Sequence, residues 1–146
     1  MRAQYTPRVG REPLEAVRYI CAMGARAFDF EALVAEALDS LPASLAAHLD
    51  NVEVVVSAWP SAMQLAEAGL RRPEELMGLY EGTPRTQRSA DYGMTLPDHI
   101  TIFSGPILRV SGSAAAAREE VRRTVIHELA HHFGIDDDRL TELGAY

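Results

Sequence analysis

Residues 124–137 read TVIHELAHHFGIDD, and this stretch decides the fold of the chain. It contains the pattern H-E-x-x-H, formed by His127, Glu128 and His131. Residues four apart lie on one face of an α-helix with Cβ atoms about 5–6 Å apart, so both imidazoles can bind one tetrahedral Zn²⁺ ion. Glu128 projects about 100° further around the helix, where a base can take a proton from zinc-bound water. The pattern therefore predicts a zinc-binding helix.

A third zinc ligand is expected just after this helix. Gly134 can end the helix and let the chain turn back. Asp137 then completes the longer pattern H-E-x-x-H-x-x-G-x-x-D, at a position where many enzymes with this motif carry a third histidine. A carboxylate is an acceptable zinc ligand, which favours Asp137. Glu142, another carboxylate or water alone remain alternatives, and residues 136–138 can also be read as a solvated acidic turn.

The residues before the motif extend the predicted helix. Ser113 can cap a helix that runs from residue 114 to about residue 133. If His127 is set at 0°, His131 falls near about 40° and Glu128 near about 100° around the helix axis. The apolar side chains of the helix spread over the opposite arc: Val121, Val125, Ile126, Leu129, Ala130 and Phe133. We expect this arc to face the core and the metal-binding side to face a cleft.

The rest of the chain predicts an α+β fold with a small sheet. Three short strands are expected, at residues 52–58, 78–82 and 99–103. Gly105 and Pro106 should end or bulge the last strand, and residues 106–110 should continue it irregularly. Two helices are expected before the first strand, one that Asp29 caps and a short one over residues 43–49. We therefore expect a small mixed sheet packed against the active-site helix and this N-terminal helix pair.

The composition is typical of a single soluble domain. The chain has 146 residues and a net charge of −7, which argues against nucleic acid as the main partner. No apolar run approaches the roughly 18 residues of a membrane-spanning helix. Cys21 is the only cysteine and no secretion signal is recognisable, so we expect a cytoplasmic protein. Residues 1–27 carry five arginines against two acidic residues, and we expect a partly disordered or helical extension there, attached to a domain of residues 28–146.

These motifs resemble the small bacterial zincin-like metallopeptidases that are sometimes called minimal zincins. The resemblance covers residues 28–146 and is carried by four stretches: GLYEG at 78–82, LPDHITIF at 96–103, GPIL at 105–108 and HELAHHFGIDDDRLTEL at 127–143. It implies a fold of helices with a small sheet and the zinc-ligand pattern given above. Only nine residues follow Asp137, so the downstream Met-turn of metzincins is not expected, and a shallow, open site is.

The expected activity is zinc-dependent hydrolysis of peptide bonds, with Glu128 taking the proton of the zinc-bound water and returning it to the leaving amine. A peptide or protein substrate is expected to add to the exposed edge of the strand at residues 99–103. The alternative is a non-catalytic binding or regulatory protein that retains the zinc site. A structural zinc site is a weaker alternative, because such sites have four protein ligands and favour cysteine, which the C-terminal segment lacks.

The remaining polar candidates have weaker arguments. His132 falls off the metal-binding side of the helix, so a place in the core or behind the ligands is expected for it. His99 is expected at the surface, and Cys21 is expected to have no role at the site. Three tyrosines are candidate oxyanion donors, although core or surface positions are the default for them: Tyr80, Tyr92 and Tyr146.

Overall fold

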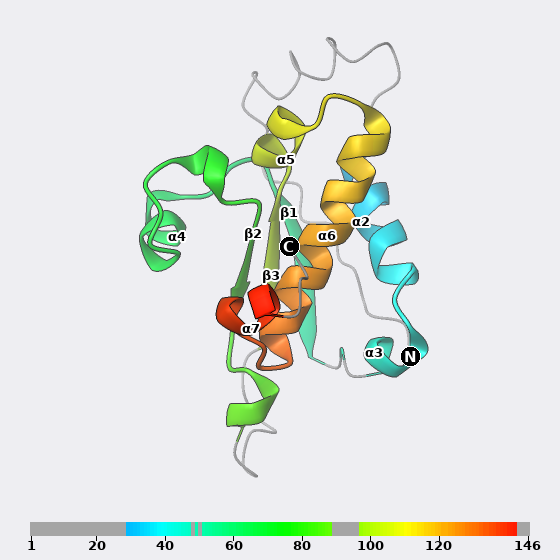
Figure 1. Cartoon of the computed structure of the whole chain (residues 1–146), viewed down its shortest axis with the longest axis vertical. Coiled ribbons are helices and arrows are strands. Elements are labelled where there is room, and N and C mark those ends of the chain that lie inside the picture. Colours follow the sequence, from blue (N-terminus) through cyan, green and yellow to red (C-terminus); the bar gives the residue numbers. More distant parts are fainter. Residues whose placement is uncertain (1–28, 48, 50, 89–96, 143–146) are drawn as a thin grey trace.

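Helices surround a small three-stranded sheet in the computed structural model of the chain, which describes residues 29–47, 49, 51–88 and 97–142 (Figure 1). The elements in chain order are α2 (Phe30–Asp39), α3 (Ala43–Ala46), β1 (Val52–Ser57), α4 (Ala62–Glu67), η1 (Pro73–Glu75), β2 (Gly78–Glu81), η2 (Arg85–Gln87), β3 (Asp98–Phe103), α5 (Ser104–Val110), α6 (Ala114–His132) and α7 (Asp137–Glu142). The predicted α+β class is confirmed. The expected extension at residues 1–27 lies outside the described part. Among the described helices, none is both long enough and apolar enough to cross a bilayer.

The sheet has the strand order β1-β3-β2. β1 pairs with β3 in parallel, with Val54 opposite Ile100, and β2 pairs with β3 antiparallel, with Gly78 opposite Ile102. The expectation of a free edge on the strand at residues 99–103 is therefore wrong, because β3 is the central strand and has a neighbour on each side. Within the described part of the chain, β1 and β2 are the edge strands of this sheet.

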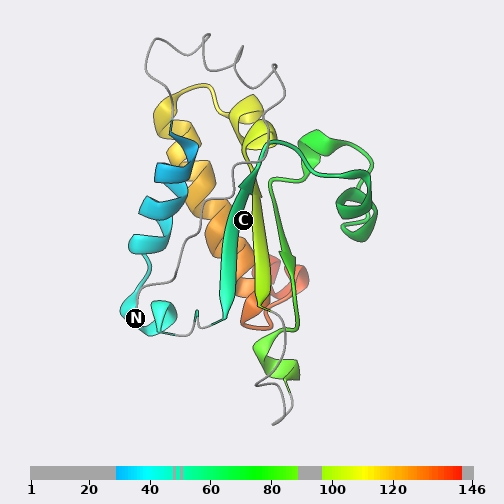
Figure 2. The same ribbon diagram turned by 180° about the vertical axis from the view of Figure 1, so that it is seen from behind.

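The core lies where α6 packs on the sheet and α2 packs on α6. Figure 1 shows α6 in front of the strands, and Figure 2 shows the same helix behind them. Among the apolar side chains that α6, β3 and α2 bury there are Val34, Ile100, Ile102, Val121, Val125 and Leu129, each no more than 3% exposed. Each contributes about 1.5–3 kcal/mol through burial. Ile126, which was expected on the buried arc, is 39% exposed, because it lies outside the contacts with the sheet and α2.

Two segments differ from the sequence-based expectation. β3 leads directly into the helix α5 rather than into an irregular extension, and Pro106 lies in the first turn of α5, where its missing N–H costs nothing. Gly105 lets the chain pass close to the end of β1, since its N–H donates to the carbonyl of Ala58 at 2.8 Å and a Cβ would collide with the ring of Trp59. The helix expected over residues 43–49 ends at Ala46, after which the chain turns and buries Leu49.

The long helix has the ends that the sequence predicts. The side chain of Ser113 accepts a hydrogen bond from the N–H of Ala116 at 3.1 Å and so caps the first turn of α6. The helix closes at Phe133, and Gly134 follows with a φ of +82°, in the left-handed region that favours glycine. These two ends fix which residues of the motif lie in the last turns of α6.

Loss of the cap at Ser113 should destabilise the protein without changing its fold. We expect Ser113→Ala to lower the free energy of unfolding by about 1 kcal/mol, because an N–H of the first turn loses its acceptor. Ser113→Asp is the matched control and should retain most of the stability, since its carboxylate also caps. Urea unfolding of both variants beside the wild type measures the difference, and an alanine variant as stable as the wild type would contradict the capping role.

Candidate metal centre

The last turns of α6 place two histidines on one side of the helix. The rings of His127 and His131 lie 4.8 Å apart between centroids, at an interplanar angle of 84°. Both side chains are 23% exposed, so each ring is partly covered and can still be reached from solvent. The imidazoles therefore face the same space, as residues four apart on a helix should.

A reversal of the chain after α6 brings Asp137 to these rings. The N–H of Gly134 donates to the carbonyl of His131 at 2.9 Å, and the N–H of Ile135 donates to the carbonyl of Ala130 at 2.9 Å. Asp137 begins α7, and its Oδ1 lies 3.1 Å from Nε2 of His127 and 3.4 Å from Nε2 of His131. One ligand atom from each of these three residues lies within 4.8 Å of the others.

Two distances within this donor set are close to those of a zinc site. Ligand atoms 2.0–2.2 Å from a tetrahedral zinc ion are about 3.3–3.6 Å apart, close to the two distances from Asp137. Nδ1 of His131 donates to the carbonyl of Ile135 at 2.9 Å, which leaves Nε2 of the neutral ring as the metal-binding nitrogen. Burial and the neighbouring ring of His131 lower the pKa of His127, which favours the neutral imidazole that metals bind.

Glu128 lies beside these groups in a nearly dry environment. Its side chain is 6% exposed, and burial raises its pKa to about 8. The backbone N–H of Tyr80 on β2 donates to the carboxylate and opposes part of this shift. A Cβ at Gly78 would lie 2.8 Å from both Cγ and Oε1 of Glu128 and 2.7 Å from Cγ2 of Thr124. Glycine at position 78 therefore lets the edge strand β2 lie directly against the buried carboxylate.

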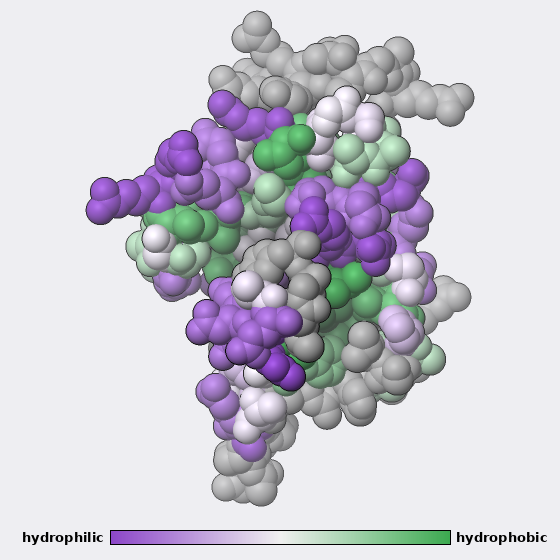
Figure 3. Space-filling view, viewed as in Figure 1, coloured by the Kyte–Doolittle hydropathy of each residue, from purple (hydrophilic) through white to green (hydrophobic). Residues whose placement is uncertain are grey.

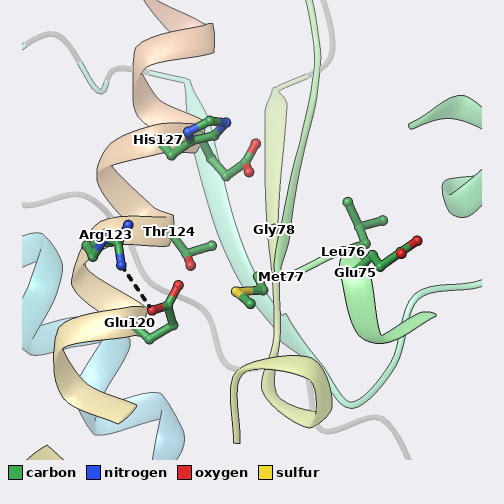
Figure 4. Close-up of a pocket in the computed structure, with 9 residues that line it drawn as sticks. Glu75, Leu76, Met77, Gly78, Glu120, Arg123, Thr124 and His127 are labelled. Atoms are coloured by element: carbon green, nitrogen blue, oxygen red, sulfur yellow. Dashed lines mark hydrogen bonds and ion pairs between the residues drawn. The ribbon is translucent and has the colours of Figure 1, made fainter. Parts of the chain in front are cut away.

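A pocket of about 250 Å³ opens next to this carboxylate. Figure 4 shows it between α6, which contributes Glu120, Arg123 and His127, and the segment that enters β2, which contributes Leu76 and Met77. Arg123 pairs with Glu120 at 3.5 Å, so these opposite charges lie together at the pocket wall. The full lining consists of Glu75, Leu76, Met77, Gly78, Glu120, Arg123, Thr124, His127 and Glu128.

Comparison with known proteins assigns the chain to a family. A family model described as zincin-like metallopeptidase matches residues 49–145. The chain belongs to this family. The predicted resemblance is thereby confirmed, and zinc is the metal that membership in a zincin-like family implies. The match extends from before β1 to beyond α7 and so contains the sheet, α6 and α7. No curated protein matches the chain significantly.

The other carboxylates near the zincin-like motif lie outside the three-residue group. Glu142 pairs with Arg139 at 2.7 Å on the surface of α7. Asp136 accepts a hydrogen bond from the backbone N–H of Arg139 at 2.9 Å. Figure 3 shows that the surface over α7 is hydrophilic, in keeping with these exposed charges. The geometry therefore favours Asp137 over its neighbours as the carboxylate closest to the histidines.

The remaining sequence candidates fall away from the donor set or outside the described residues. His132 is fully buried and contacts Asp98, as expected for a residue behind the ligands. His99 is 44% exposed and lies 3.3 Å from Glu53. The hydroxyl of Tyr80, one of the candidate oxyanion donors, donates to Asp98 at 2.8 Å in this structure. Three further candidates lie outside the described part of the chain: Cys21, Tyr92 and Tyr146.

The sequence does not single out Asp98 as a candidate functional residue, although it is only 1% exposed at the start of β3. An acidic residue just ahead of an apolar strand is ordinarily a surface residue, so its position gave no signal. Gly78 was also missed, because glycine in the stretch 78–82 was read only as part of a short strand. Both residues act through contacts with distant elements, which a local pattern does not contain.

The raised pKa of Glu128 predicts how the stability of the metal-free zincin-like fold changes with pH. The ordinary glutamate pKa is about 4.3, so the folded state binds more protons than the unfolded state between about pH 4.5 and 8. The free energy of unfolding therefore falls as the pH rises through this window, by up to about 1.4 kcal/mol per pH unit. Glu128→Gln cannot ionise, so we expect the variant to become more stable than the wild type towards pH 8.

Urea unfolding at several pH values, with a chelator present, measures this difference. His127 and the other titrating groups are present in both proteins, so the difference between the two curves isolates Glu128. Parallel curves from pH 5 to pH 8 would show that the buried carboxylate does not carry the shift.

Proposed function

We propose that this chain is a zinc-dependent peptide hydrolase in which His127, His131 and Asp137 hold the metal and Glu128 is the general base. The observation that carries the proposal is the position of Oδ1 of Asp137, 3.1 Å from Nε2 of His127 and 3.4 Å from Nε2 of His131, beside the buried carboxylate of Glu128. Membership in the zincin-like metallopeptidases supports the general class, and the assignment of roles to these residues is our proposal. We also propose that the functional domain begins near residue 28, since α2 packs on α6 although it precedes the family match.

Zinc, when bound, supplies Lewis-acid chemistry that polarises a carbonyl and acidifies water. The side chains of the protein then carry out the proton transfers. Glu128 accepts it from the attacking water and returns it to the departing amine. Burial brings the pKa of Glu128 close to neutral pH, where a single group can both accept and release a proton. His131 is oriented for its role by the hydrogen bond to the carbonyl of Ile135.

The edge of β2 is the proposed place for an extended peptide. The carbonyl of Met77 accepts from the N–H of Phe103 at 2.8 Å, so odd-numbered residues of this segment direct their backbone groups towards β3. Gly78 and Tyr80 therefore direct theirs to the free side, and the N–H of Tyr80 reaches Glu128 there. A peptide that pairs with this edge would run past the base and the metal ligands. The edge of β2 thus replaces the edge of β3 that the sequence suggested.

The pocket beside β2 is a proposed site for one side chain of the substrate. Its volume of about 250 Å³ is below the roughly 300–1,000 Å³ of pockets that enclose whole small ligands. Leu76 and Met77 supply apolar surface, and the charges of Glu120 and Arg123 offset each other. These features favour an apolar side chain of moderate size. A cytoplasmic location and the lack of a nucleic-acid partner stay predictions from composition.

Metal analysis tests the ligand assignment. The purified protein should hold about one zinc ion per chain, and His127→Ala or His131→Ala should abolish binding, because each removes one of two rigidly placed nitrogens. Asp137→Ala should weaken the affinity by more than the roughly 10–100-fold that loss of an outer partner costs. Asp136→Ala, Asp138→Ala and Glu142→Ala are matched controls and should bind zinc nearly as the wild type does. A large loss in Glu142→Ala with little in Asp137→Ala would reassign the third ligand.

Turnover tests the role of Glu128 and separates an enzyme from a binding protein. Glu128→Gln keeps the shape of the side chain but cannot accept the proton, so zinc content should stay near the wild-type value while cleavage of a peptide library falls about 10²–10⁴-fold. Mass spectrometry of the digests measures the cleavage. Wild-type protein that is fully loaded with zinc and cleaves no peptide would favour the non-catalytic binding or regulatory alternative. Undiminished cleavage by the variant would contradict the assignment of the base.

A further inference from the structure

Asp98 is the centre of a buried polar cluster that the proposed reaction does not use. Its Oδ2 accepts a hydrogen bond from the hydroxyl of Tyr80 at 2.8 Å and lies 2.9 Å from Nδ1 of His132, which donates to it. Arg88 forms an ion pair with the same oxygen, and the N–H of Thr83 donates to Oδ1 at 3.4 Å. Four groups from three separate parts of the chain therefore converge on one carboxylate.

Such a buried charge is costly unless its surroundings pair it. Asp98 is 1% exposed and its partner Arg88 is 16% exposed, so both charged groups are largely removed from water. Gly82 lies so close that a Cβ there would be 2.8 Å from Cβ of Asp98. Hydrophobic residues in place of a buried ion pair are often no less stable, so the polar contacts of this cluster are consistent with a role in positioning.

The cluster ties the segment of residues 82–88 to the end of α6. Nε of Arg88 donates to the carbonyl of Thr83 at 3.0 Å, which closes the segment into a loop around η2. A terminal nitrogen of Arg88 also lies 3.4 Å from Nδ1 of His132, the residue directly after the candidate ligand His131. The segment is thus held to Asp98, and Asp98 in turn binds His132 at the end of the metal-binding helix.

Thr86 extends this connection to the turn that carries Asp137. A Cβ on Gly134 would collide with Oγ1 of Thr86 and lie 2.8 Å from its Cγ2, so the threonine packs directly on the backbone of Gly134. Figure 1 shows the η2 segment below α7, at the end of α6. Asp137 itself is 66% exposed, compared with 23% for each histidine, so a smaller part of its side chain is packed against the protein. Its place therefore depends on the turn beneath it.

We propose that Asp98, Arg88 and Thr86 are positioning residues that hold the turn of residues 134–137, and with it Asp137, within ligand distance of the two histidines. Asp98 fixes Arg88, Arg88 fixes the loop around η2, and Thr86 presses on the turn. The proposal rests on the zinc site of the proposed function and is independent of peptide hydrolysis. Its test therefore measures zinc affinity in the absence of substrate.

Zinc affinity is measured by chelator competition for Thr86→Ala and for the double variant Arg88→Met/Asp98→Asn. The double variant removes both charges, so neither is left buried without its partner. We expect each to bind zinc about tenfold more weakly than the wild type, in the range typical of lost outer contacts. Arg122→Met is the matched control, because it removes an ion pair with Glu119 on the exposed side of α6, and its affinity should be unchanged.

A double-mutant cycle with Asp137→Ala distinguishes positioning from general support of the fold. If the cluster acts through Asp137, neither Thr86→Ala nor the Arg88→Met/Asp98→Asn pair should weaken zinc binding further in the Asp137→Ala background. An equal loss in both backgrounds would overturn the proposal, and so would full zinc affinity in both variants. Thermal unfolding of the metal-free proteins checks the fold. Thr86→Ala changes only an exposed side chain, so it decides the outcome if the double variant does not fold.

A protein that binds zinc but cleaves nothing would contradict the proposed hydrolysis and leave this test intact. An unchanged zinc affinity in Asp137→Ala alone would overturn the positioning proposal, because its target would then not be a ligand. The two proposals therefore fail through different measurements.

Discussion

The contact between the edge strand β2 and α6 exists because residue 78 has no side chain. A Cβ there would come within 2.8 Å of Glu128 and 2.7 Å of Thr124, so any other residue would push the strand away from the helix. The close approach takes the carboxylate of Glu128 out of water and gives it the N–H of Tyr80 as a partner. The burial that raises the pKa of the carboxylate follows from this contact, which also places the edge strand β2 beside it. The proposed base and a strand edge are thus brought together by packing and not by a loop.

The three metal-ligand candidates are supported in two different ways. His127 and His131 are held by the packing of α6, whose opposite side buries Val121 and Val125 in the core. Asp137 begins a six-residue helix after a reversal at Gly134, and its side chain is 66% exposed. The polar cluster around Asp98 contacts both the end of α6, which carries the histidines, and the loop around η2. The candidate donor set therefore combines two residues of the packed helix α6 with one residue that follows the turn at Gly134.

Local patterns in the sequence predicted those parts of the molecule that depend on neighbouring residues. The histidine spacing, the cap at Ser113 and the reversal at Gly134 follow from helix geometry and from glycine's access to positive φ, and all three are present. The strand order was not predictable, because an apolar run does not say which strand it pairs with. For this reason the sequence predicted a free edge on the strand at residues 99–103, which is the central strand of the sheet. Asp98 was missed for a related reason, since its burial depends on groups that come from distant parts of the chain.

The parallel pairing of β1 with β3 also affects how the chain reaches this structure. The two strands lie side by side, although β2, α4 and the loop around η2 all come between them in the sequence. Contacts of this kind require closure of a long loop before they stabilise anything, and they slow folding. The candidate metal ligands, in contrast, all come from residues 127–137, whereas His132 meets Asp98 across 34 positions of the chain. We therefore expect the ligand-bearing helix and turn to form as a local unit, with the sheet and its buried carboxylate assembling around them later.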